Sequence, residues 1–100
     1  MQFIVTGYDG KDDGALDRRM AARDAHLKGA EEMADNGKWL YAAAILNEKE
    51  QMAGSVIVCE FDSEESLKKE WLDIEPYILG KVWEKVEITR AQVPPLFDKK

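Results

Sequence analysis

The sequence contains few residues of the types that bind metals or form disulfides. Its single cysteine, Cys59, excludes an internal disulfide, and its place in an apolar segment indicates a structural role. One histidine, His26, beside that one cysteine is too few for the usual zinc ligand sets. No phosphate-binding loop or dinucleotide fingerprint is present either. We therefore expect neither a bound metal nor a cofactor.

Long apolar stretches are absent as well. The longest uninterrupted apolar runs fall far short of the roughly 18 residues that a membrane-spanning helix needs. Residues 1–5 do not form a basic region followed by a long apolar stretch, which is the pattern of a signal peptide. These features predict a cytoplasmic protein without a membrane partner.

The balance of charge is acidic. The 100 residues include 20 acidic and 14 basic side chains, a formal net charge of −6. This charge argues against a nucleic-acid partner, because proteins that bind nucleic acid present a basic face. With 45% hydrophobic residues the chain is too apolar for disorder, and its length fits a single domain over residues 1–100. Because so short a chain buries only about two-thirds of its unfolded surface, we expect a homodimer to cover more.

The apolar pattern predicts four strands and two helices. β-branched and aromatic residues mark the strands, while apolar residues at helical spacing mark the helices. The predicted order is strand 2–8, helix 16–36, strand 39–46, strand 55–61, a helix that begins at 62–65, strand 82–90, and an extended tail over 91–100. This order predicts an α+β protein of the ferredoxin-like βαββαβ arrangement, with both helices on one face of the sheet.

Two finer patterns follow from spacing within the later elements. Leu67, Trp71, Ile74 and Ile78 recur at helical spacing, so they are predicted to share one stripe of a helix. Alternation in the last strand predicts Val86 on one face of the sheet and Trp83 on the other.

The first helix carries the residues that are most suggestive of chemistry. On a helical projection centred on Leu16, Leu27 falls within about 40° of the centre and His26 falls roughly 80° away, on the side of Arg19. Arg23 falls almost within the apolar stripe, where a guanidinium needs an acceptor. Two interpretations remain open. Arg23 forms a structural ion pair beside a boundary histidine, or both side chains line a polar pocket and His26 transfers protons.

Two carboxylates near the second helix are candidate partners of the histidine. Asp73 and Glu75 precede Pro76, where a helix dipole disfavours negative charge unless the acid has a partner. A carboxylate that accepts a proton from one imidazole nitrogen orients the ring and makes the other nitrogen a better base. The alternative is that both acids are solvated turn residues.

Two motifs resemble those of a known family. Residues 23–27, Arg-Asp-Ala-His-Leu, resemble the Arg-x-x-His-Leu helix motif of the YciI-like family, and Glu75-Pro76-Tyr77 is similar to its Asp-Pro-Tyr motif. The resemblance implies a dimeric α+β barrel whose site pairs the motif histidine with the motif aspartate. Here Glu75, one methylene longer, occupies that position, so Asp73 stays open as the partner of His26.

The resemblance also implies an activity. The family includes a small enzyme of aromatic degradation that eliminates HCl from a chlorinated hydroxyhydroquinone, so we expect a cofactor-independent dehydrochlorinase with a small aromatic substrate. The alternatives are an isomerase or quinol monooxygenase of the dimeric barrel type, or a non-catalytic dimeric ligand-binding module. The expected roles are acid/base catalysis by His26, orientation by Glu75 or Asp73, phenolate stabilisation by Arg19 or Arg23, a hydrogen bond from Ser55, and a pocket lining that includes Tyr8 and Trp39.

Overall fold

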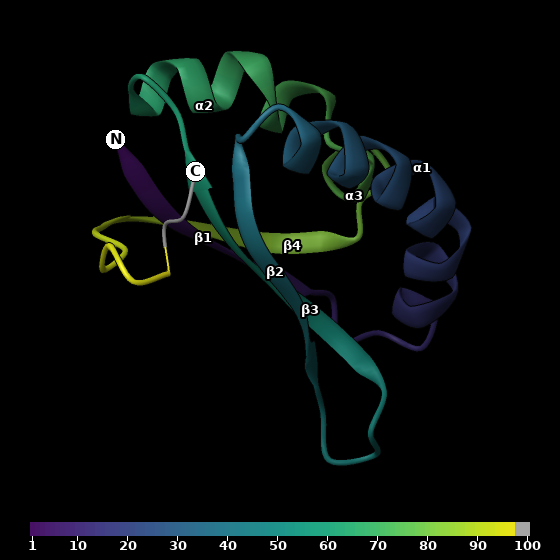
Figure 1. Cartoon of the computed structure of the whole chain (residues 1–100). Coiled ribbons are helices and arrows are strands. Elements are labelled where there is room, and N and C mark those ends of the chain that lie inside the picture. Colours follow the sequence, from purple (N-terminus) through teal and green to yellow (C-terminus); the bar gives the residue numbers. More distant parts are fainter. Residues whose placement is uncertain (98–100) are drawn as a thin grey trace.

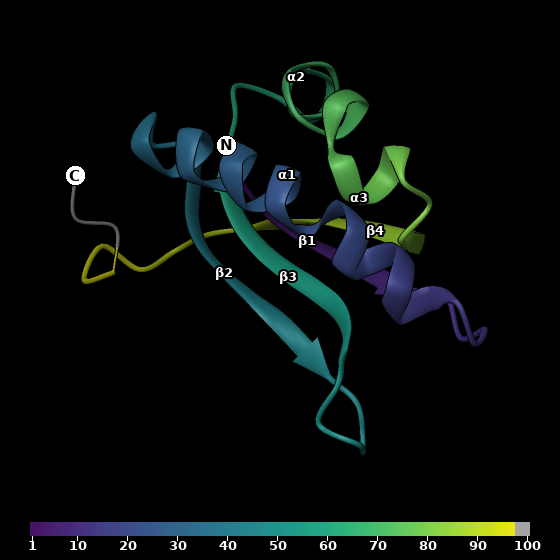
Figure 2. The ribbon, with the colours of Figure 1, turned by 90° about the vertical axis from the view of Figure 1, so that its right-hand side faces the viewer.

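A four-stranded antiparallel sheet carries all the helices on one face (Figure 1). The computed structural model describes residues 1–97. The elements are β1 (Gln2–Asp9), α1 (Ala15–Asp35), β2 (Trp39–Leu46), β3 (Met52–Glu60), α2 (Glu64–Glu70), the 3₁₀ helix η1 (Leu72–Ile74), α3 (Pro76–Leu79) and β4 (Trp83–Ala91). The strand order β2-β3-β1-β4 confirms the predicted α+β class and the ferredoxin-like βαββαβ arrangement. In both views the β2–β3 hairpin projects beyond the helical layer (Figures 1 and 2).

The two helix boundaries that the sequence marked most clearly are confirmed. Gly37 has φ 74°, its N–H donates to the carbonyl of Ala34, and the N–H of Lys38 donates to the carbonyl of Met33. These two bonds end α1 in a Schellman motif, which needs a left-handed residue and so favours glycine. Ser63 caps α2 by accepting from the N–H of Ser66.

The inward face of α1 differs from the predicted apolar stripe. Leu27 and Met20 are exposed, whereas Arg19 and His26 are buried. The helix is therefore rotated relative to the projection that the apolar residues suggested. The reason is that polar side chains occupy the centre of its inner face, so the hydrophobic pattern alone points to the wrong side.

The second helical region is broken rather than continuous. Leu67 and Trp71 are buried as predicted, but Ile74 is 61% exposed, so the proposed common stripe is wrong there. The helix ends at Glu70, and the 3₁₀ turn that follows shifts the phase of the side chains. Tyr77 becomes the next fully buried side chain.

A β-bulge in β4 changes which face of the sheet Trp83 occupies, compared with the prediction. Tyr8 pairs with Lys85 and Asp9 pairs with Trp83, so Glu84 is an extra residue on β4. The bulge moves Trp83 to the helix-facing side, where it is 6% exposed, and the prediction that it lies opposite Val86 is wrong.

The C-terminal segment is only partly extended. β4 continues to Ala91, and the N–H of Phe97 donates to the carbonyl of Pro94 and closes a turn. Residues 98–100 of the predicted tail lie outside the described residues. Between residues 1 and 97, no helix has the length and apolar character to cross a membrane.

The close packing of β1 against β4 yields a stability test at Gly7. A Cβ at Gly7 would overlap the indole of Trp83, at 2.6 Å from its Cγ, whereas a Cβ at Gly29 of α1 meets nothing within 4 Å. We expect Gly7→Ala to lower the free energy of unfolding by about 1–3 kcal/mol, as for other overpacked sites. Gly29→Ala is expected to raise it by up to about 1 kcal/mol, because alanine favours helix. Urea unfolding of both variants makes the comparison, and a Gly7→Ala protein as stable as the wild type would contradict the packing.

Candidate active site

A buried histidine–carboxylate pair joins α1 to the segment before α3. Nδ1 of His26 lies 2.8 Å from Oε2 of Glu75, and the side chains are 9% and 3% exposed. A buried carboxylate is unfavourable unless it is hydrogen-bonded or paired, so this contact fixes both side chains. Of the two carboxylates that the sequence proposed, Glu75 contacts the histidine, while Asp73 is exposed in η1.

Glu75 accepts hydrogen bonds from three different groups. Besides His26, the indole N–H of Trp71 donates to Oε1 at 2.9 Å, and the backbone N–H of Tyr77 donates to Oε2 at 2.8 Å. The last bond makes Glu75 the N-cap of α3, with Pro76 at the first helical position, where a missing N–H is tolerated. Glu75 thus follows the short 3₁₀ helix η1 but also caps the start of α3, where backbone N–H groups favour an acid.

The ring of Tyr77 contacts two cationic or basic side chains. It stacks on His26 with centroids 3.8 Å apart and planes 11° apart, and the guanidinium of Arg19 lies 4.6 Å from its centroid. Burial raises the pKa of the Tyr77 phenol, while the charges of Arg19 and Arg23 act in the opposite direction. The stack restrains the imidazole plane, which the single bond to Glu75 would leave free to rotate.

A second buried network approaches the same place from β1 and β3. Arg19 donates through Nη1 to both oxygens of Asp9, at 2.9 and 3.1 Å, and through Nη2 to Oγ of Ser55 at 2.8 Å. Burial raises the pKa of the Asp9 carboxyl, and the Arg19 guanidinium offsets part of that rise. Because Ser55 Oγ accepts from Arg19, its own O–H is the group left to donate outward.

Both networks border one cavity. Its volume is about 170 Å³, and it lies between α1 and the β2–β3 ribbon. The lining residues are Arg19, Arg23, His26, Leu27, Ala42, Ala43, Ala44, Met52, Ser55, Ile57 and Tyr77. Leu27 and the alanines are exposed, so the cavity opens to solvent between α1 and β2. A larger hollow of about 690 Å³ lies beside the β1–α1 loop and the hairpin but includes neither His26 nor an arginine.

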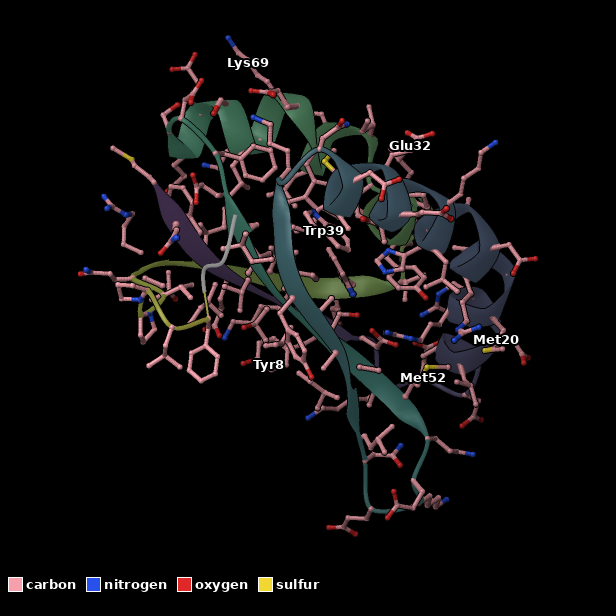
Figure 3. All side chains as sticks on the ribbon, viewed as in Figure 1. Tyr8, Met20, Glu32, Trp39, Met52 and Lys69 are labelled. Carbon is pink, nitrogen blue, oxygen red and sulfur yellow. The ribbon has the colours of Figure 1, made fainter. Side chains whose placement is uncertain are left out.

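Two predicted lining residues lie outside the cavity. Figure 3 shows Trp39 between the sheet and the helices and Tyr8 on the opposite side of the sheet. Trp39 packs 5.7 Å from His26, centroid to centroid, and borders the core rather than the cavity. Tyr8 donates to Glu87 at 3.0 Å on the outer face and lines the larger hollow. The structure therefore places His26, Glu75, Arg19, Arg23 and Ser55 together, without Tyr8 or Asp73.

Sequence reasoning missed Asp9 and the stacking by Tyr77. Asp9 follows a strand and precedes glycine, so it is typical of a loop aspartate. A stricter count of alternation from Phe3 and Val5 would have placed Asp9 on the buried face, where an acid needs a cation.

The remaining candidate groups are structural in this geometry. The thiol of Cys59 is fully buried, and burial raises its pKa to about 12, far from the range of a reactive thiolate. Across residues 1–97, no group of three or more His, Cys, Asp and Glu side chains is arranged to hold a metal ion.

Sequence comparisons match the chain to a protein family and to two of its relatives. The family profile of the YCII-related domain matches residues 1–92. Protein YciI of Escherichia coli O6:H1 and Protein YciI of Shigella flexneri are each 29% identical over 94 residues, which is 88% of this chain and 93% of the relative.

A solved structure shares the fold over nearly the whole chain. It is 5-chloro-2-hydroxyhydroquinone dehydrochlorinase (TftG) from Burkholderia phenoliruptrix AC1100 in complex with 2,5-dihydroxybenzoquinone. The match has a TM-score of 0.79 at 19% identity and covers 96% of this chain and 98% of the other. At this identity the likeness supports the arrangement of strands and helices.

Proposed function

The chain belongs to the YCII-related domain family, and from that premise we propose that it is a cofactor-independent lyase that removes HCl from a chlorinated hydroxyhydroquinone. The observation that carries the proposal is the buried His26–Glu75 pair, in which His26 lines a small cavity. The structural relative is named as a dehydrochlorinase and was solved with a dihydroxybenzoquinone. A reaction of that class needs proton transfer and stabilised oxygen anions, and the side chains around this cavity are suited to both.

His26 is the proposed acid and base. Glu75 engages Nδ1, so Nε2 is the nitrogen left to exchange a proton with a ligand. The carboxylate stabilises the imidazolium that forms when Nε2 takes a proton, and the Tyr77 stack holds the ring plane. The roles of Glu75 and Tyr77 are therefore to position and stabilise the imidazole.

Arg19 and Ser55 are the proposed site for the developing phenolate. Asp9 and Ser55 hold the guanidinium in one geometry, and the Ser55 hydroxyl keeps a proton to donate. A donor that is already oriented stabilises charge without reorganising during the reaction. Asp9 acts through Arg19 in this account and does not touch the ligand.

These residues complete a balanced elimination. The phenol next to the chlorinated carbon gives its proton to Nε2 of His26, and the same proton returns to the carbon that bears chlorine, leaving a ketone. The oxygen across the ring then gives its own proton to Nε2 of His26, which is neutral again after the first transfer. The electrons of that oxygen form a new carbonyl, the ring double bond shifts, and the carbon–chlorine bond breaks. The ring becomes a hydroxyquinone, one proton and one chloride are lost in sum, and no oxidant is consumed.

Chloride release tests the reaction directly. With 5-chloro-2-hydroxyhydroquinone, we expect enzyme-dependent chloride release that falls by about 10²–10⁴-fold in kcat for His26→Ala, the usual contribution of a general acid/base. Glu75→Gln is also expected to lower kcat, because an amide does not stabilise an imidazolium. Asp73→Asn, a matched change at the exposed acid, is expected to retain activity.

The controls separate this lyase from its alternatives. A reaction without protein corrects for spontaneous oxidation, and an oxygen electrode detects a quinol monooxygenase. Chloride release no faster than in the protein-free control would rule out the dehydrochlorinase. Full turnover by His26→Ala would rule out its mechanism.

We also propose that a second copy of the chain covers the outer face of the sheet. That face carries Ile4, Tyr8, Tyr41, Val56 and Val58, and none of the helices between residues 1 and 97 covers it. Tyr41 is 69% exposed, which is unusual for a large apolar side chain in a sheet. The projecting β2–β3 hairpin extends the same surface (Figure 2).

The oligomeric state tests this interface. Sedimentation equilibrium is expected to give twice the 11.4 kDa of one chain. Tyr41→Glu should shift the protein to the monomer, because a two-fold interface buries the new charge twice. The matched control is Leu79→Glu, a change at an apolar residue that is 66% exposed on the helical side, and it should stay dimeric. A wild-type monomer would contradict the proposal.

The other proposed partner is the small aromatic substrate. Nucleic acid does not fit an acidic chain with a net charge of −6. The proposed compartment is the cytoplasm, in keeping with a single free cysteine.

A further inference from the structure

The charge of the cavity is opposite to the charge of the chain. The chain carries a net −6, but the charged or ionisable side chains that line the cavity are Arg19, Arg23 and His26, with Tyr77 beside them. Over residues 1–97, no carboxylate belongs to the lining. A small site whose wall is basic in an acidic protein is built for a ligand of negative charge.

Among the three arginines of α1, Arg23 is the one whose charge is not neutralised by an ion pair. Arg18 pairs with Asp12 and Arg19 pairs with Asp9, but within the described chain Arg23 has neither an ion pair nor a hydrogen bond. The helix itself offers it no acid, since positions 19, 20, 26 and 27 hold Arg, Met, His and Leu. Arg23 is nevertheless half-buried at the cavity wall, where a free guanidinium is unfavourable without a partner.

The opposite wall of the cavity is made of small or apolar side chains and Ser55, and among the described residues it carries no charge. Ala42 and Ala44 of β2 are on the helix-facing side of their strand, pairing with Ile57 and Ser55, yet they are exposed because their short side chains leave a gap below α1. Larger residues here would fill the cavity. The ligand's charge must therefore be recognised from α1.

We propose that Arg23 binds an ionised oxygen of the ligand, so that this site takes a planar ring that is already anionic when it binds. The identity of the ring rests on the proposed function, whereas its charge follows from the cavity. Arg19 and Arg23 then have different tasks. Arg19, whose charge is neutralised by Asp9, forms with Ser55 the site for the phenolate that develops during the reaction, and Arg23 supplies the net charge that selects the anion.

This division reduces what the single histidine has to do in the elimination. The reaction removes protons from two oxygens, and the chain has one histidine. If one oxygen is ionised before binding, it supplies the electron pair that expels chloride, and His26 does not have to act as a base a second time. His26 is then needed only for the proton that moves from the other oxygen to the ring carbon.

Ligand binding without turnover tests the role of Arg23. The probes are 2,5-dihydroxybenzoquinone, which is ionised at neutral pH, and hydroquinone, which is uncharged there, with affinity measured by titration calorimetry. The wild type is expected to bind the anionic ring at least ten-fold more tightly than hydroquinone. Arg23→Gln should weaken binding of the anion by about ten- to a hundred-fold, the range for a hydrogen bond to a charged group. It should leave the affinity for hydroquinone unchanged. Arg23→Lys should retain most of the affinity, because it keeps the charge.

The matched control is Lys28→Gln, which removes the same charge from an exposed position of the same helix. It should bind both probes as the wild type does, and circular dichroism checks that every variant is folded. Equal weakening by Lys28→Gln, or unchanged binding of the anion by Arg23→Gln, would overturn the inference. The two proposals fail separately. If the anion binds through Arg23 but no chloride is released, this inference holds and the lyase activity is ruled out. If chloride is released but binding of the anion does not depend on Arg23, the lyase activity holds and this inference is ruled out.

Discussion

The carboxylate of Glu75 is the group on which the site depends. It is buried, and three hydrogen bonds converge on it, from His26 of α1, from the core indole of Trp71 and from the backbone of the first turn of α3. A buried charge of this kind is stable only while all of its donors are in place, so the three elements are held in one arrangement. The same bonds that satisfy the carboxylate also orient His26 and Tyr77, which joins the packing of the core to the geometry of the site.

The site shapes its surroundings in ways that ordinary packing would not. The inner face of α1 carries Arg19 and His26 where an amphipathic helix would carry leucine, and β2 opposes them with alanines instead of larger β-branched residues. The polar residues of α1 and the alanines of β2 both reduce the apolar contact between helix and sheet, and a small polar cavity remains between them. Apolar burial is instead concentrated between the sheet and the segment of α2 and α3, where the side chains of Trp71, Tyr77 and Phe61 are fully buried.

Much of the fold was predictable because strand alternation, glycine stops and serine caps act locally. The element order and the end of α1 at Gly37 followed from such signals. The sequence also named His26, but it left Glu75 and Asp73 as alternatives for its partner. The face of the sheet or helix on which an individual side chain lies was less predictable. The bulge at Glu84 moves Trp83 to the other face of the sheet. The inner face of α1 is not the side on which its hydrophobic residues cluster. Asp9 was overlooked because its partner, Arg19, is brought close only by the tertiary fold.

The tautomer of His26 tests the central claim most directly. Because His26 is the single histidine in the chain, the ¹⁵N shifts of its imidazole can be assigned without ambiguity. If Glu75 is an ionised acceptor, the neutral ring carries its proton on Nδ1 and leaves Nε2 free as the base, a form less common in water. Shifts of a protonated Nδ1 and a bare Nε2 at alkaline pH are the predicted result. A ring protonated on Nε2 instead would contradict the account, because Glu75 would then be donating a proton rather than accepting one.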